Sequence, residues 1–223
     1  MSGKFRKWWF SNIQANALDC EDLKVILATR NRKKVEEFQR VLEGTSLRLL
    51  DLREYPQAPE VVEDGATFTE NAVKKALQIA RFTGLPALAD DSGLEVDALG
   101  KRPGVHSARY AGPDATDRQN LEKMLLELGD CPASARTARF VCVLAMADAS
   151  GRTRIFAGVV EGRISSIPQG ENGFGYDPVF VPEGESRTFA QMSSVEKDAM
   201  SHRGRAIASL VAALNDHGES FLT

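Results

Sequence analysis

The chain has 223 residues, enough for one domain or one two-lobed domain. With 43% hydrophobic and 26% charged residues it can form a sizeable core, which excludes a disordered chain. A formal net charge of −3 offers no global attraction for nucleic acid or an anionic membrane, so we expect neither as a partner. No apolar run approaches the roughly 18 residues of a membrane span.

The cysteines and the N-terminal residues indicate in which cellular compartment we expect the protein. Cys20, Cys131 and Cys142 lack the spacing of a zinc site, so we expect free thiols and a cytoplasmic protein. Residues 1–23 are basic and aromatic at first and then acidic, without the apolar stretch of a signal peptide. We expect an N-terminal extension that packs as a helix or arm on the body, with a functionless tail or a targeting segment as alternatives.

The body opens with alternating strands and helices. Residues 23–29 form a short β-rich apolar run, which predicts a buried parallel strand. Residues 31–44 have apolar positions at helical spacing, with Asn31 as the expected N-cap and Gly44 closing the helix. Residues 46–52 predict a second strand.

A second helix and a third strand follow. In residues 67–84, Thr67 and Glu70 have the spacing of a capping box and Gly84 closes the helix. Residues 85–96 (LPALADDSGLEV) predict a strand with a sharp exit, because Asp-Ser-Gly is good turn chemistry.

The second half changes pattern. We predict a helix over 112–130 capped near Thr116, an antiparallel hairpin from 135–148 and 153–165, a glycine-rich loop over 168–184, and helices over 193–218 begun by a Ser193–Glu196 box. The predicted fold is α/β with mixed strands. We expect residues 24–223 to form a single domain whose second lobe spans roughly residues 116–180.

Basic residues surround the start of the first helix. Arg30, Arg32, Lys33 and Lys34 lie where a helix N-terminus presents unpaired N–H groups and partial positive charge. Such a cluster is suited to an anion, most plausibly phosphate. A solvated basic turn is the alternative, and the Walker A pattern is absent.

Acids follow on the third strand and before the second helix. Asp90 and Asp91 lie where open α/β sheets bind ligands, and adjacent strand residues face opposite sides. A carboxylate there can hold Mg²⁺ or take a proton from water, although a simple acidic turn is also possible. Glu63 is the better candidate for a second metal ligand, and Glu54 is a further possibility.

Two later stretches carry aromatic and cationic residues. In GFGYDP (173–178), Phe174 or Tyr176 is suited to stacking on a base, and Asp177 to binding a donor on the ring or the ribose. An ordinary turn is the alternative. The donors of Lys197, His202 and Arg203, with a break expected between the first two, match the O6 and N7 acceptors of a keto-purine. An ordinary helix surface would also explain them.

The ordered motif set resembles one family. LATxNxxK, TFxENA, ADDSGL, PGxxSARYAG, GFGYDPVF and EKxxxSHRGRA, between about residues 24 and 214, are similar to the non-canonical purine nucleoside triphosphate pyrophosphatases of bacterial type. The resemblance implies a long mixed sheet with flanking helices in two lobes around a deep cleft, a Maf/Ham-type architecture, and a homodimer. It implies Mg²⁺-dependent hydrolysis of ITP, dITP and XTP to the monophosphate and pyrophosphate, which cleanses the nucleotide pool.

The resemblance also assigns roles to residues. It makes Asp91 the catalytic acid and a metal ligand, with Glu63 as a less secure second ligand and Asp90 as support or alternative. The implied substrate contacts are Thr29, Arg30, Asn31, Arg32, Lys33, Lys34, Ser92, Phe174, Gly175, Tyr176, Asp177, Lys197, His202 and Arg203.

The chain also departs from the family pattern. Arg30 and Lys33 stand where the family often has glycine, and residues 1–23 have no counterpart in the short bacterial form. Two other functions stay open: a nucleotide-binding regulatory module without turnover, and a Maf-like pyrophosphatase acting on pyrimidine or modified nucleotides.

Overall fold

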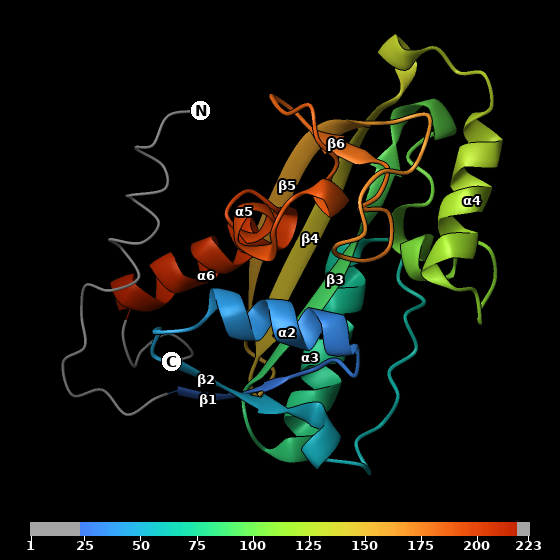
Figure 1. Ribbon diagram of the computed structural model, residues 1–223. Helices are drawn as coiled ribbons and strands as arrows, with labels where there is room; N and C mark the ends of the chain where they lie inside the picture. Colours follow the sequence, from blue (N-terminus) through green and yellow to red (C-terminus); the bar gives the residue numbers. More distant parts are fainter. Residues whose placement is uncertain (1–22, 218–223) are drawn as a thin grey trace. The chain divides into compact units, whose positions relative to one another are not determined.

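A computed structural model describes residues 23–217 and confirms the α/β class. Six strands in this range form a mixed sheet in the order β2-β1-β3-β4-β5-β6 (Figure 1). The strands are β1 Leu23–Leu27, β2 Leu47–Asp51, β3 Ala87–Val96, β4 Thr137–Ala147, β5 Thr153–Ile164 and β6 Phe180–Pro182. The α-helices are α2 Arg32–Val41, α3 Phe68–Thr83, α4 Asp117–Leu128, α5 Ser194–Asp198 and α6 His202–His217.

The chain divides into two compact units. Unit 1 contains the residues up to Asp91, Val143–Ala157 and the residues from Gly204 onward, and unit 2 contains Ser92–Cys142 and Gly158–Arg203. The second lobe expected over roughly residues 116–180 overlaps unit 2. Unit 2 begins earlier, ends later and omits Val143–Ala157.

Unit 1 starts with two parallel crossovers. β1 pairs with β2 on one side and with β3 on the other, both in parallel. The helix α2 connects β1 to β2, and α3 connects β2 to β3. Asn31 caps α2 as predicted, since its side chain accepts a hydrogen bond from the Lys34 amide at 3.2 Å. The helix already ends at Val41, so Gly44 lies in the following turn, with φ of 79°.

The ends of α3 follow the prediction with one change. Thr67 accepts the Glu70 amide at 3.1 Å, and Gly84 closes the helix in the left-handed conformation. The Glu70 carboxylate, however, accepts the amide of Ala66 at 2.7 Å, one residue before the cap. Only half of the expected capping box is therefore formed.

The predicted turn after the two acids is wrong. β3 runs without interruption through Asp90, Asp91, Ser92 and Gly93 and ends at Val96. Asp90 and Asp91 are almost completely buried, and both make ion pairs with lysines of unit 1. Because buried charges must be paired, these lysines explain why the acids lie inside a strand rather than in a solvated turn.

Unit 2 has its own aromatic core. Phe140, Phe180 and Phe189 pack with ring centroids 4.7 to 6.1 Å apart, inside a cluster that also includes Leu94 and Met124. These distances are typical of favourable aromatic pairs. The predicted hairpin strands are neighbours in the sheet, and β5 pairs antiparallel with β6.

The helical predictions for the later part of the chain hold. Thr116 and Ser193 both form complete capping boxes. The expected break between Lys197 and His202 is present, because α5 ends at Asp198 and α6 begins at His202.

Three expectations concern other parts of the chain. The N-terminal extension and Cys20 lie outside the described residues, apart from Leu23 at the start of β1. Cys131 and Cys142 are free thiols. Within residues 23–217, no helix combines the length and apolar character needed to cross a bilayer.

Candidate active site

The basic turn in unit 1 lies at a switch point of the sheet. β2 and β3 flank β1 on opposite sides, and open α/β sheets bind ligands at the carboxyl end of such a strand. The turn from Thr29 to Lys34 occupies this end. Its first polar contact is local, since the Asn31 amide donates to Thr29 Oγ1 at 3.2 Å. α2 has no acid in its first turn, so its N-terminus is suited to an anion.

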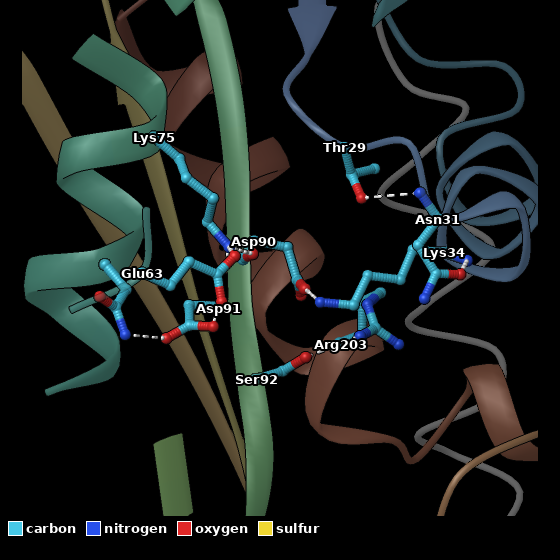
Figure 2. Close-up of polar contacts among 10 residues, drawn as sticks. Thr29, Asn31, Lys34, Glu63, Lys75, Asp90, Asp91, Ser92 and Arg203 are labelled. Carbon is cyan, nitrogen blue, oxygen red and sulfur yellow. Dashed lines mark hydrogen bonds and ion pairs between the residues drawn. The ribbon is translucent and has the colours of Figure 1, made fainter. Parts of the chain in front are cut away.

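The basic side chains of this turn have different surroundings. Arg30 donates from Nη2 to the Ala58 carbonyl at 2.7 Å and thereby connects the turn to the loop after β2. Arg32 and Lys33 are exposed. Lys34 is half-buried, and its ammonium forms an ion pair with Asp90 (Figure 2). The arginine that replaces the common family glycine therefore has a structural contact of its own.

Asp91 faces the other side of β3. Its Oδ2 accepts a hydrogen bond from Asn71 Nδ2 at 3.1 Å, and its Oδ1 lies 3.7 Å from Lys75 Nζ, both on α3. Figure 2 shows Asp91 and Lys75 across the strand from Lys34. The two adjacent acids thus have separate partners on α2 and α3, as the alternation of side chains along a strand predicts.

Lys75 brings Glu63 into the same cluster. Its ammonium donates to Glu63 Oε1 at 2.7 Å and to the Asp90 carbonyl at 2.7 Å (Figure 2). Two carboxylate oxygens, from Glu63 and Asp91, therefore face one cationic group. Glu54 lies instead on the 3-10 turn after β2, where its side chain is exposed.

Burial gives Asp91 the protonation properties of a general base. Desolvation raises its pKa to about 6, with a further increase from Glu63, while Lys75, Lys34 and the Asn71 hydrogen bond act in the opposite direction. A carboxyl group with this pKa is ionised near neutral pH and is a stronger base than an exposed aspartate.

The oxygen atoms of Glu63 and Asp91 are suited to a hard cation. Mg²⁺ prefers oxygen ligands and usually keeps several waters or phosphate oxygens beside one or two carboxylates. Among residues 23–217 no group of three or more His, Cys, Asp or Glu side chains is arranged to hold a metal. The carboxylates of Glu63 and Asp91, which both face Lys75, are of the type and number that Mg²⁺ commonly takes from a protein.

In unit 2, Asp177 organises the glycine-rich loop. Its Oδ2 accepts hydrogen bonds from the Phe174 amide at 2.9 Å and from Lys197 Nζ at 2.6 Å, and both charged side chains are buried. Gly173 has φ of 73°, and a Cβ there would lie 2.1 Å from Asp177 Oδ2. This close approach explains a glycine at position 173.

The two aromatic residues of the loop have different environments. The Phe174 ring is half-buried, with Lys197 Nζ 4.9 Å and Arg203 Cζ 5.9 Å from its centroid. The Tyr176 ring belongs to the unit 2 core, and its hydroxyl donates to the Ser107 carbonyl at 2.9 Å. Burial raises the pKa of this phenol. Tyr176 thus connects the loop to the PGxxSARYAG segment.

The remaining predicted contacts of unit 2 are placed by neighbouring elements. Arg203 Nη2 donates to Ser92 Oγ at 2.9 Å, which connects the start of α6 to β3. The His202 ring stacks on Phe140 with centroids 4.6 Å apart. The Gly175 amide donates to Asp117 Oδ2 at 3.1 Å.

Asn71 and Lys75 were not among the predicted site residues. Both lie on the buried face of α3 together with Ala72, Ala76 and Ile79. Polar residues at an i, i+4 spacing within an otherwise apolar helix face are the signal that could have identified them.

Comparisons with known proteins identify the family of the chain. Residues 25–213 match the Ham1 family. A dITP/XTP pyrophosphatase of Syntrophobacter fumaroxidans is 54% identical over 83% of this chain and 79% of its own length. One from Geobacter sulfurreducens is 49% identical over 87% and 96%, respectively.

Solved structures show the same fold. A HAM1 protein from Coxiella burnetii has a TM-score of 0.80 and 43% identity, covering 87% of this chain and 99% of that one. A nucleoside-triphosphatase (dITP/XTP pyrophosphatase) from Mycobacterium abscessus has a TM-score of 0.70 and 47% identity, covering 84% and 98%. With a family match over most of its length and relatives at this identity, the chain belongs to the Ham1 family.

Proposed function

We propose that this chain hydrolyses non-canonical purine nucleoside triphosphates (ITP, dITP and XTP) to the monophosphate and pyrophosphate, and so cleanses the nucleotide pool. The single observation that carries the proposal is the buried Asp91, with its pKa near 6, in a cluster with Glu63 and Lys75. The relatives named dITP/XTP pyrophosphatase support the substrate class.

Water attacks the α-phosphorus in line with the departing pyrophosphate. Asp91 orients this water and accepts its proton. The N-terminal amides of α2 and the ammonium of Lys34 stabilise negative charge on the phosphates. Asp91 and Glu63 would hold Mg²⁺, which when bound supplies charge neutralisation on the phosphate oxygens. Asp90, paired with Lys34, keeps that lysine in place.

Base selection falls to the cluster around Lys197 in unit 2. Lys197 and Arg203 carry several N–H donors each and lie close to the Phe174 ring, which is suited to stacking on a base. A 6-keto purine accepts from such donors, whereas the 6-amino group of ATP would leave them unpaired, which is a strong basis for rejection. A homodimer in the cytoplasm, without nucleic acid as a partner, is part of this proposal.

A substrate panel tests the function. Pyrophosphate release with Mg²⁺ is measured for ITP, dITP, XTP, ATP, dUTP and m7GTP. We expect kcat/KM for ITP and XTP to exceed that for ATP by at least about 10²-fold, as unpaired buried donors predict. Asp91→Asn should lower kcat by about 10²-fold or more. The matched Asp148→Asn change, in the β4–β5 connection, should leave kcat near the wild-type value.

Three results would contradict the proposal in different ways. Comparable rates for ATP and ITP would remove the selectivity. Preference for dUTP or m7GTP would favour the Maf-like alternative. Binding of ITP without release of pyrophosphate would favour a regulatory module.

A further inference from the structure

We propose that Asn71 is a positioning residue that fixes Glu63 relative to Asp91 and thereby sets the affinity of the site for its divalent cation. This inference rests on the proposed metal-dependent hydrolysis. Asn71 lies in the first turn of α3 and has no solvent-exposed surface. All the contacts that carry the argument lie within unit 1.

The side-chain amide of Asn71 joins two segments of the site. Its Oδ1 accepts a hydrogen bond from the Gly65 amide at 2.8 Å, and its Nδ2 donates to Asp91 Oδ2 at 3.1 Å. Gly65 follows Glu63 by two residues on the loop that precedes α3. One planar group therefore connects the loop that carries Glu63 to the strand that carries Asp91.

Asparagine is the residue type that this bridge requires. The Gly65 amide can only donate and an ionised Asp91 can only accept, so the group between them needs one acceptor and one donor. Aspartate would present a second carboxylate to Asp91, and an apolar side chain would leave the buried Asp91 Oδ2 and the part-buried Gly65 amide without this partner. Leaving such groups unpaired is costly inside a protein.

The packing around Gly65 makes the bridge sensitive to small changes. A Cβ at position 65 would lie 2.7 Å from Asn71 Oδ1 and 2.8 Å from Glu70 Cβ. Real Cβ atoms do not approach so closely, so the loop or the Asn71 amide would have to move. Gly65→Ala therefore disturbs the same bridge from the loop side.

The bridge has a direct consequence for the carboxylates. With Asp91 Oδ2 held by Asn71, Oδ1 is the oxygen that faces Lys75, together with Glu63 Oε1. Groups that orient metal ligands in this way commonly affect metal affinity by about 10- to 100-fold. We therefore assign Asn71 to the geometry of the cation site and not to contact with the nucleotide.

The test compares Asn71→Leu and Gly65→Ala with Asn120→Leu. Asn120 is the matched control, because it is also a buried helix asparagine and lies on α4 in unit 2. Its side chain likewise bridges two groups: Oδ1 accepts from the Ala111 amide at 2.7 Å, and Nδ2 donates to the Ala108 carbonyl at 3.0 Å. Free Mn²⁺ is followed by electron paramagnetic resonance during titration of the full chain without nucleotide. The half-saturating Mg²⁺ concentration and KM are measured separately with ITP.

We expect Asn71→Leu and Gly65→Ala to weaken Mn²⁺ binding by about tenfold and to raise the half-saturating Mg²⁺ concentration in parallel. At saturating Mg²⁺, KM for ITP should change much less than this. Asn120→Leu should have a lower melting temperature than the wild type but should bind Mn²⁺ with the same affinity.

Wild-type Mn²⁺ affinity in folded Asn71→Leu, or an equal loss in Asn120→Leu, would overturn the proposal. If Asn71→Leu does not fold, Gly65→Ala decides alone. Because Mn²⁺ binding is measured without nucleotide, a wild type that fails to cleave ITP would refute the proposed function and leave this comparison valid.

Discussion

At the scale of single residues, two buried aspartates of unit 1 differ in the direction of their pKa shift. Desolvation raises the pKa of Asp91 to about 6. The Ser150 hydroxyl lowers the pKa of Asp148 to about 2, with help from Arg152. A raised carboxyl pKa means that ionisation destabilises the folded state, and a lowered pKa means that ionisation stabilises it.

The same substitution should therefore have opposite effects at these two positions. Without metal, Asp91→Asn should raise the free energy of unfolding at pH 7 by about 2 kcal/mol, a gain that vanishes as pH falls from about 6 to below 4. Asp148→Asn should lower the free energy of unfolding at pH 7, and this loss should shrink as pH falls from about 4 toward 2. Urea unfolding at pH 7 and pH 4 measures both, and destabilisation by both changes at pH 7 would contradict the assigned environments.

At the scale of elements, the glycine-rich loop contains two glycines with similar backbone conformations and different surroundings. Gly173 and Gly175 have φ of 73° and 61°, so alanine costs about 1 kcal/mol of backbone strain at either position. Only at Gly173 would the new Cβ meet Asp177, whereas no atom lies within 4 Å at Gly175. Gly173→Ala should therefore lose more unfolding free energy than Gly175→Ala, and equal losses in urea titrations would show that the Asp177 contact adds nothing.

The sequence predicted elements better than their contacts. Helical spacing and caps placed α2, α3 and α4 correctly, because these signals lie within a few residues of each other. The turn predicted after the acids was wrong because local turn chemistry ignores distant partners: Lys34 precedes Asp90 by 56 residues, and Asn71 precedes Asp91 by 20. Contacts at such separations decide whether a carboxylate can remain inside a strand.

The same limit applies to the candidate site. The motifs predicted Asp91 and Lys197 as site residues, and the structure gives each a buried ionic environment. The motif also offered Tyr176 as a base contact, and the structure adds that its ring lies in the unit 2 core and its hydroxyl donates to the Ser107 carbonyl. Whether a side chain faces the core or a ligand depends on packing that a short motif does not encode.

At the scale of the whole molecule, the chain passes from one unit to the other inside two of the motifs named above, ADDSGL and EKxxxSHRGRA. The boundary between Asp91 and Ser92 lies within β3, and that between Arg203 and Gly204 lies in the first turn of α6. In the proposed function, the residues expected to act on the phosphates lie in unit 1, and Lys197 and Arg203, the residues expected to read the base, lie in unit 2.

The proposed cation site predicts how metal binding affects the stability of the entire chain. A cation that binds only the folded state at about 100 times its Kd adds about 2.7 kcal/mol, or roughly 5–10 °C in Tm for a chain of this size. We expect Mg²⁺ to raise the wild-type Tm in this way and EDTA to reverse the effect, because a cation in the proposed site would neutralise the carboxylates of Asp91 and Glu63. Glu63→Gln and Asp91→Asn should lose most of this shift, while Asp148→Asn keeps it. Calorimetric scans at constant ionic strength would measure these shifts, and an undiminished Mg²⁺ shift in Asp91→Asn would place the cation elsewhere in the molecule.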